Sequence, residues 1–165
     1  MEIWDAYFKD GSLAGRDLVR GEPIPDGLYH LCCEILVRHT DGDYLLMERA
    51  PDKEPYGGYL EASAGGSALK GEDPLTCAKR ELFEETGITA ENLSEFGVST
   101  VDKVICHSFL CITDHDKGAV TLQEGETVSS RWVSEAEFKA FVASDKMMDS
   151  QRVRYRDFLS KMGYL

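Results

Sequence analysis

The sequence predicts a single α/β domain, spanning residues 1–165, in which helices flank a mixed β-sheet. Segments that resemble strands, separated by turns and loops, occur within residues 3–64 and 93–133. A helical segment with clear start and stop signals separates them, and two more helical patterns follow the last strand. The chain has 165 residues, of which 42% are hydrophobic and 29% charged, so it can bury a full core.

Five strands are expected before the central helix. Asp10-Gly11 and Asp41-Gly42-Asp43 supply turns between the first two and the next two. Residues 50–58 contain two prolines and two glycines, which indicates a long loop, and Gly65-Gly66 indicates a turn after the fifth strand. The expected strands are Ile3–Phe8, Arg16–Arg20, Tyr29–His39, Tyr44–Arg49 and Tyr59–Ala64.

Signals for a helix stand at both ends of residues 74–86. Asp73 suits the N-cap, Pro74 suits the first helical position, and Gly87 suits the left-handed residue after the last turn. This segment is therefore expected to be a capped helix.

Four strands and two helices are expected in the remainder. Ser134 and Glu137 have the spacing of a capping box, which predicts a helix directly after the last strand. A final helix should begin near Asp149 and end before Gly163, with an apolar stripe over residues 155–162. The expected strands are Leu93–Val101, Lys103–Thr113, Ala119–Leu122 and Ser129–Val133.

Three glutamates of the central helix carry the functional prediction. Glu81, Glu84 and Glu85 occupy positions i, i+3 and i+4, so their carboxylates share one helix face. Like charges at this spacing repel one another, and Mg²⁺, which prefers carboxylate oxygens, waters and phosphates, would relieve the repulsion. The alternative for these residues alone is an acidic face exposed to solvent.

The residues around the glutamates favour the metal site. Residues 66–88, GSALKGEDPLTCAKRELFEETGI, follow the pattern G-x5-E-x7-R-E-U-x-E-E-x-G-U, in which U is aliphatic. This segment resembles the Nudix box, and the resemblance implies an α/β/α sandwich with a mixed sheet. Every fixed position is filled, by Gly66, Glu72, Arg80, Glu81, Leu82, Glu84, Glu85, Gly87 and Ile88.

The resemblance also implies an activity, namely hydrolysis of a nucleoside diphosphate linked to another moiety. Glu81, Glu84 and Glu85 would hold Mg²⁺, or Mn²⁺ as a substitute, and one of them or a loop carboxylate would deprotonate the attacking water. We therefore place Glu84, Glu81 and Arg80 in the catalytic machinery. Arg80 is expected to pair with a box carboxylate and orient it, and Glu72 to support the loop.

Residues outside the box are expected to complete the site. Glu124, Glu126 or Asp102 could supply a further acidic ligand. Arg49 is the first choice for a cation that meets phosphate, ahead of Lys53 and Arg38. For each of these residues the alternative is a charged side chain in solvent.

A weaker resemblance links the flanking segments to the isopentenyl-diphosphate isomerase-like branch of the same superfamily. The true isomerases have a Cys just before the box glycine and a His just after it, whereas this chain has Gly65 and Ser67. His30 matches a metal-binding histidine of the isomerases. Without the partners of that histidine, the alternative is a strand histidine in the core or the cleft wall, and His30 is kept as a candidate site residue. The matching segments are Trp4-Asp5, Gly15-Arg16, Arg20-Gly21-Glu22-Pro23, Tyr29-His30-Leu31, Arg49-Ala50-Pro51-Asp52-Lys53 and Arg131-Trp132-Val133.

Two alternatives to the hydrolase follow from these resemblances. One is an isopentenyl-diphosphate isomerase, which Gly65 and Ser67 disfavour. The other is a non-catalytic binder of phosphorylated metabolites, for which loss of box glutamates would be expected. The sequence does not identify the substrate.

Composition limits the partners and the location. The net charge of −12 argues against a nucleic-acid polymer or an anionic membrane as partner, but a bound metal would still permit a small diphosphate substrate. Five cysteines without paired spacing are expected to be buried free thiols of a cytoplasmic protein, with no zinc site. No secretory signal is expected at the N-terminus. A homodimer is compatible with the sequence.

Overall fold

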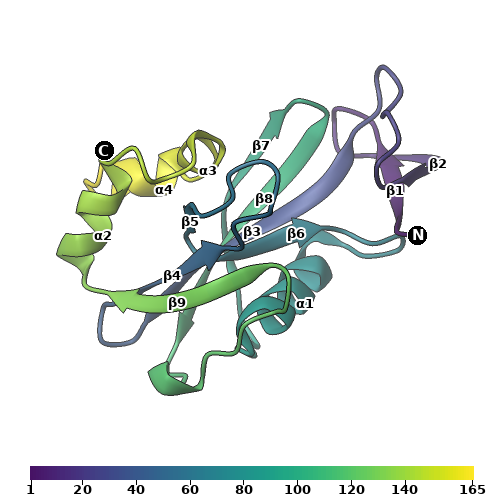
Figure 1. The fold of residues 1–165 in the computed structure, drawn as a ribbon. Helices are drawn as coiled ribbons and strands as arrows, with labels where there is room; N and C mark the ends of the chain where they lie inside the picture. The colour runs from purple at the N-terminus through teal and green to yellow at the C-terminus, as the bar shows by residue number, and fades with distance from the viewer.

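A computed structural model describes residues 1–165 and shows a three-layer α/β/α sandwich with a small N-terminal hairpin at one end (Figure 1). The mixed sheet and its flanking helices agree with the prediction. The elements in chain order are β1 (Ile3–Tyr7), β2 (Leu13–Val19), β3 (His30–His39), β4 (Tyr44–Arg49), β5 (Leu60–Glu61), β6 (Ala64–Ser67), α1 (Pro74–Thr86), β7 (Ser94–Val101), β8 (Val104–Thr113), the 3₁₀-helix η1 (Lys117–Ala119), β9 (Thr127–Val133), α2 (Glu135–Val142), α3 (Asp149–Arg154) and α4 (Arg156–Lys161).

The central strand, β3, is shared by two branches of the sheet. It pairs in parallel with β8 along its whole length, whereas all other strand pairs are antiparallel. On its other edge, β6 pairs with residues 32–35 and β4 pairs only at Arg38. β4 and β6 therefore pair with different stretches of the same edge of β3. The backbone of β6 lies where β4 is no longer paired with β3.

Alternation along β3 divides the core between the two faces of the sheet. Cys33 and Ile35 point to one face, where α1 packs through Leu82. Leu36 points to the other face, where it belongs to the same buried cluster as Phe138 of α2 and Phe158 and Leu159 of α4. Each fully buried side chain of this size contributes roughly 1.5–3 kcal/mol to folding.

The ends of α1 are where the sequence predicts them. The carboxylate of Asp73 accepts a hydrogen bond of 2.7 Å from the backbone N–H of Thr76, and Pro74 is the first helical residue. Gly87 has φ +73°, and its N–H bonds the carbonyl of Phe83 at 2.8 Å. The capping box of α2, formed by Ser134 and Glu137, is confirmed as well.

Three expected elements are wrong in detail. Ala119–Leu122 is not a strand, because the N–H of Thr121 bonds the carbonyl of Thr86 at the end of α1 instead of a neighbouring strand. The expected strand over residues 59–64 is split into β5, which pairs with β4, and β6, which pairs with β3, so Gly65-Gly66 is strand rather than turn. The final helix is two short helices that meet at Tyr155, where ψ is 1°.

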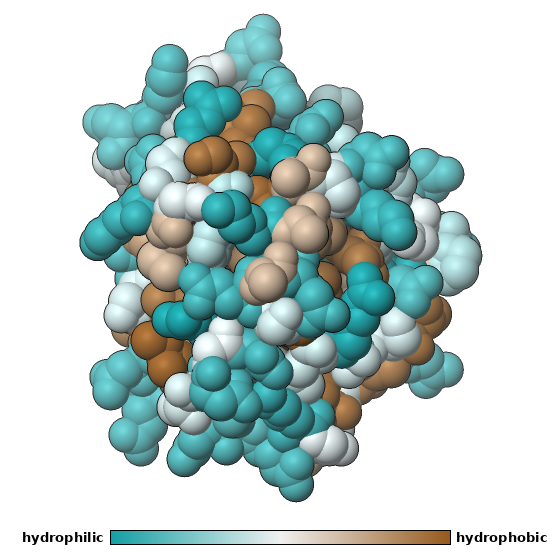
Figure 2. Space-filling model, turned by 90° about the vertical axis from the view of Figure 1, so that its left-hand side faces the viewer, coloured by the Kyte–Doolittle hydropathy of each residue, from teal (hydrophilic) through white to brown (hydrophobic).

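The cysteines are buried, and the surface seen from one side is mostly hydrophilic (Figure 2). All five cysteines are buried and none is in a disulfide, although Cys33 Sγ and Cys77 Sγ lie 3.0 Å apart. Hydrophilic residues cover most of the face seen in Figure 2, and hydrophobic residues appear there in separate groups. None of the helices is both long enough and apolar enough to cross a bilayer.

Candidate active site

The three glutamates of α1 share one helix face and differ in exposure. Glu85 is buried, with 6% of its surface exposed, and its Oε2 accepts a 3.0 Å hydrogen bond from the N–H of Gly65. Glu81 is half-buried and Glu84 is exposed. The three carboxylates therefore range from Glu85, which is buried against the backbone of β6, to Glu84, which faces solvent.

Arg80 joins these carboxylates to the loop that precedes the helix. Its Nη1 donates to Glu81 Oε1 at 2.8 Å and to Glu84 Oε2 at 3.0 Å. Its Nε and Nη2 donate to the two oxygens of Glu72 at 2.7 and 2.9 Å, and Nη2 also donates to the carbonyl of Ser67 at 3.1 Å. One guanidinium thus fixes two of the three glutamates and both ends of the loop.

Gly66 makes room for this arrangement. A Cβ added at Gly66 would lie 2.3 Å from Glu81 Oε1, and Arg80 holds that carboxylate in place. A side chain at this position would therefore displace Glu81 from the site.

A cavity of about 300 Å³ lies against the glutamate face, and we call it the glutamate cavity. Three of the residues suggested by the sequence line it together with the box: Arg49, which is paired with Glu61, and Lys53 and Glu126, which are paired with each other. Its lining residues outside the box are Glu2, Arg20, Arg49, Lys53, Gly65, Gln123 and Glu126.

Three other residues suggested by the sequence lie away from this cavity. Glu124 is exposed on the loop before β9, and Asp102 is exposed in the turn between β7 and β8. Arg38 lies near the far end of β3, with Nη2 3.5 Å from Glu135 on α2.

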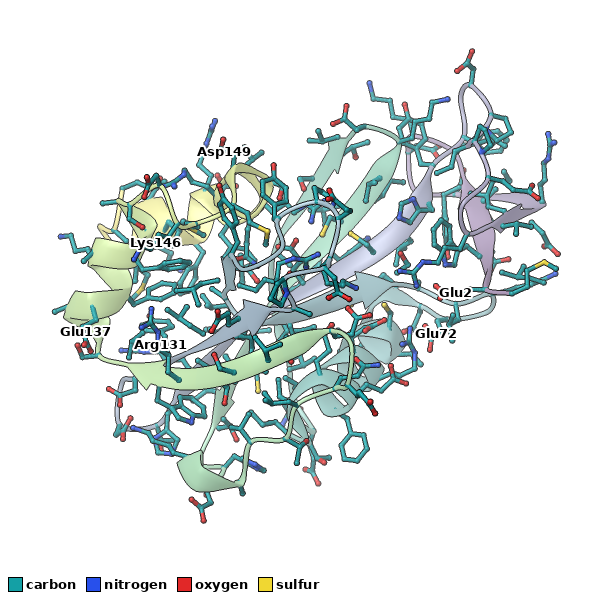
Figure 3. All side chains as sticks on the ribbon, viewed as in Figure 1. Glu2, Glu72, Arg131, Glu137, Lys146 and Asp149 are labelled. Carbon is teal, nitrogen blue, oxygen red and sulfur yellow. The ribbon has the colours of Figure 1, made fainter.

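Sequence reasoning missed two residues of the glutamate cavity, Glu2 and Arg20. They come from the N-terminal hairpin, and Arg20 Nη1 donates to Glu2 Oε2 at 2.8 Å. Figure 3 shows Glu2 on the same side of the molecule as Glu72 of the box loop. No local pattern marked these residues, because only the docking of the hairpin brings them to the box.

Burial and mutual repulsion disfavour the charged forms of two of the glutamates. Burial raises the pKa of Glu85 well above its ordinary value, and the charge of Glu61 adds to the rise. Burial also raises the pKa of Glu81, although Arg80 opposes the rise. A divalent cation would supply the missing positive charge, and the carboxylate oxygens are the donors that Mg²⁺ prefers. The chemistry of these donors therefore suits magnesium, although their side chains, as placed, do not form a cluster of three that could already hold a metal ion.

A second cavity, of about 480 Å³, adjoins the first one. Both are lined by Arg49 and by Gly65, Gly66 and Ser67 of β6. His30 lines the second cavity and stacks on Trp4 at 4.4 Å between ring centroids, and burial lowers its pKa to about 4. A third cavity, of about 540 Å³, lies between the hairpin and the start of α1, and none of the three glutamates lines it.

Comparison with known proteins agrees with this geometry. The family model of the NUDIX domain matches residues 28–157. The chain is a Nudix hydrolase. It is 31% identical over 151 residues to the uncharacterized Nudix hydrolase lmo0368 of Listeria monocytogenes, a match that covers 90% of this chain and 89% of the relative. As a member of this family it is a pyrophosphohydrolase.

More distant relatives match parts of the chain or its fold. The NAD-capped RNA hydrolase NudC of Haemophilus influenzae is 32% identical over 105 residues, which cover 63% of this chain and 39% of NudC. The crystal structure of DR0079 from Deinococcus radiodurans superposes with a TM-score of 0.74 at 17% identity, over 95% of this chain and 99% of that one. A MutT protein from Methanosarcina mazei superposes with a TM-score of 0.61 at 23% identity, over 82% and 93% of the two chains. These structural matches show the fold.

Proposed function

We propose that this Nudix hydrolase cleaves the diphosphate linkage of a nucleoside diphosphate derivative, or of a related small phosphorylated metabolite, and that it requires Mg²⁺, for which Mn²⁺ can substitute. One observation carries the proposal: Glu81, Glu84 and Glu85 line a single cavity together with the cations Arg49 and Lys53. Carboxylates for a metal and cations for phosphate are thus within one cavity.

In this proposal the box residues bind the metal, accept a proton and orient one another. Glu81, Glu84 and Glu85 would hold the metal, and Glu126 lies on the same cavity as a further acidic ligand. Mg²⁺ held by these carboxylates would supply positive charge for the phosphate oxygens and for activation of the attacking water. Glu84 or Glu81 takes the proton of the attacking water, and Arg80 orients both carboxylates.

The cations of the cavity are paired with carboxylates that can release them to the substrate. Arg49 is paired with Glu61 and Lys53 with Glu126. A diphosphate entering the cavity offers these cations a more highly charged partner. Arg49 also lines the second cavity, so it can contact a phosphate at the junction of the two.

The space at residue 65 supports hydrolysis over isomerisation. A Cβ added at Gly65 would lie 2.5 Å from the carbonyl oxygen of Cys33 and 3.1 Å from the Cα of Glu34, both part of the β3 backbone. The cysteine that the isomerases carry here would therefore require β6 to move away from β3. Retention of all box glutamates likewise favours an enzyme over a non-catalytic binder.

A hydrolysis screen with metal titration tests the proposal. The substrates are nucleoside diphosphates and triphosphates, nucleotide sugars, dinucleoside polyphosphates and prenyl diphosphates, each assayed for phosphate or diphosphate cleavage with and without Mg²⁺. We expect Mg²⁺-dependent cleavage of at least one nucleotide substrate and no conversion of isopentenyl diphosphate to dimethylallyl diphosphate. Formation of dimethylallyl diphosphate, or no cleavage in the whole screen, would contradict the proposal.

We propose further that the partner is a small molecule and not a nucleic-acid polymer or a membrane, since the net charge is −12. The five buried thiols support the expectation of a cytoplasmic protein. A homodimer stays a prediction, which sedimentation analysis would test.

A further inference from the structure

The second cavity, beside the glutamate cavity, has polar side chains in its wall that are not fully satisfied within the chain. Because Arg49 and Gly65 line both cavities, a ligand whose diphosphate lies among the glutamates can extend into the second one. Its volume of about 480 Å³ is within the usual range for small-molecule sites.

Glu34 is the buried acidic residue of this cavity. It lies on β3 opposite Gly65 and has 9% of its surface exposed. Its Oε1 accepts from Arg154 Nη1, whereas its Oε2 has no hydrogen-bond partner. Burial raises the pKa of Glu34, and the charge of Arg154 and the side chain of Gln151 oppose the rise. Oε2 is therefore a buried acceptor that still lacks a donor.

Hydrogen bonds hold Arg154 and Gln151 in place beside Glu34. Both come from α3, and both line the cavity. Gln151 Oε1 accepts a hydrogen bond of 2.9 Å from the backbone N–H of Ala62, so the amide side chain is anchored to the chain between β5 and β6. The cavity thus presents a carboxylate acceptor directly beside guanidinium donors.

Tyr56 adds an aromatic ring to the same cavity. It belongs to the loop after β4 and has 38% of its surface exposed. Its backbone is in the left-handed region, at φ +71°, and its ring meets the edge of Tyr59 at 5.3 Å. An accessible aromatic face of this kind stacks on flat ligand rings.

We propose that Glu34 and Arg154 determine substrate specificity by binding a nucleobase in the second cavity. The base places an N–H donor against Glu34 Oε2 and a neighbouring acceptor toward Arg154, and Tyr56 packs on its flat face. This inference rests on the proposed hydrolysis for the diphosphate part of the substrate. It adds that the enzyme selects its substrate by the nucleobase, through Glu34 and Arg154.

Other occupants fit this wall less well. A prenyl chain would cover the Glu34–Arg154 pair without giving Oε2 a donor, which leaves that oxygen desolvated and without a hydrogen bond. A sugar has hydroxyl donors but no flat face for Tyr56. A base supplies both the adjacent donor and acceptor and the aromatic face.

Binding of nucleosides to the full-length protein in Mg²⁺ buffer tests the proposal without any hydrolysis. Adenosine, guanosine, cytidine and uridine are titrated separately, with ribose as the base-free control, and backbone amide shifts are followed by NMR. We expect at least one nucleoside to bind and to shift the amides of Gly65, Gln151 and Arg154, and ribose to cause no such shifts. Absence of nucleoside binding, or equal binding of ribose, would overturn the proposal.

Variants assign the effect to Glu34. Glu34→Gln should weaken nucleoside binding by about tenfold or more, whereas Glu91→Gln, which removes an exposed and unpaired glutamate, should not change it. If Glu34→Gln does not fold because Arg154 is left unpaired, Glu34→Gln/Arg154→Gln removes both charges and should lose binding equally. Unchanged affinity in a folded variant would disprove the assignment.

The outcome is independent of the hydrolase proposal. Nucleosides contain no phosphate, so loss of diphosphate cleavage in Glu85→Gln with nucleoside binding retained would support both proposals. Nucleoside binding by a protein that cleaves no diphosphate would overturn the hydrolase proposal alone. Cleavage without base discrimination or nucleoside binding would overturn the base site alone.

Discussion

Arg80 is the residue on which the geometry of the box most depends. Its guanidinium donates to Glu72, Glu81 and Glu84 and to the carbonyl of Ser67, so it holds the loop and the helix in one arrangement. It lies among carboxylates and not among the cations left for substrate. We therefore assign it a positioning role, in which it acts on the metal through the glutamates.

Replacing Arg80 by lysine should show whether Arg80 acts by orienting the glutamates or only by its positive charge. A single ammonium keeps the charge but cannot make the two parallel bonds to Glu72 together with the bond to Ser67. We expect the Mg²⁺ concentration for half-maximal activity to rise by roughly 10–100-fold, as for other residues that orient metal ligands. Metal titration of activity measures this. Arg156→Lys, at an exposed and unpaired arginine, is the control, and an equal effect in both variants would contradict the role.

His30 gives the fold a pH dependence of its own. Burial, together with the nearby charge of Arg154, lowers its pKa from about 6.5 to about 4. The unfolded chain therefore takes up this proton first as the pH falls. The stability due to neutral His30 is complete above about pH 6.5 and is lost progressively as the pH falls to about 4.

The change His30→Phe keeps a ring on Trp4 but removes the titration. The wild-type free energy of unfolding should fall by up to about 3 kcal/mol between pH 6.5 and pH 4 on account of His30, a value that solvent screening reduces. The variant should lose this part of the decline. Urea denaturation at several pH values measures it, and parallel curves for the two proteins would contradict the account.

At the scale of elements, the C-cap of α1 offers a direct test of local geometry. Gly87 and Gly163 both have positive φ, +73° and +70°, but only a Cβ at Gly87 meets a neighbour, Thr121 Oγ1 at 2.5 Å. Gly163→Ala should therefore cost about 1 kcal/mol, and Gly87→Ala about 2–3 kcal/mol. Chemical denaturation compares the two. Equal costs would show that Thr121 moves freely and does not hold the helix end.

Elements with local signals were the predictable ones. The bounds of α1 followed from Asp73, Pro74 and Gly87, whose caps depend only on residues within one turn. Elements that depend on distant partners were not. The split of residues 59–67 between β5 and β6 arises because this segment pairs first with β4 and then with β3, and no residue inside it signals the change.

At the scale of the whole molecule, the site assembles from segments far apart in the chain. The box supplies the glutamates, the hairpin supplies Glu2 and Arg20, and the loop before β9 supplies Glu126. The motif spacing could predict the first group, because all its members lie within one helix. Glu34 and Arg154 meet across 120 residues, so sequence spacing gave no sign of them.

The tertiary fold determines which of the predicted residues line the same cavity. Arg49 and Glu126 line the glutamate cavity, whereas Glu124, two residues from Glu126, does not. Sequence alone could not separate these two loop carboxylates, since their chemistry is the same and only the path of the loop differs. His30 lines the adjoining cavity and not the glutamate cavity.

The central claim is that the glutamate face of α1 holds the catalytic metal, and Glu85→Gln tests it most directly. The change keeps the side-chain shape and removes one charged ligand at the most buried of the three positions. On the best nucleotide substrate of the screen, kcat/KM should fall by at least about a hundredfold while the far-UV circular dichroism spectrum stays unchanged. The stabilisation of the protein by Mg²⁺ in thermal unfolding should fall with it, and Glu91→Gln should behave as wild type. Near-normal turnover by folded Glu85→Gln would contradict the account.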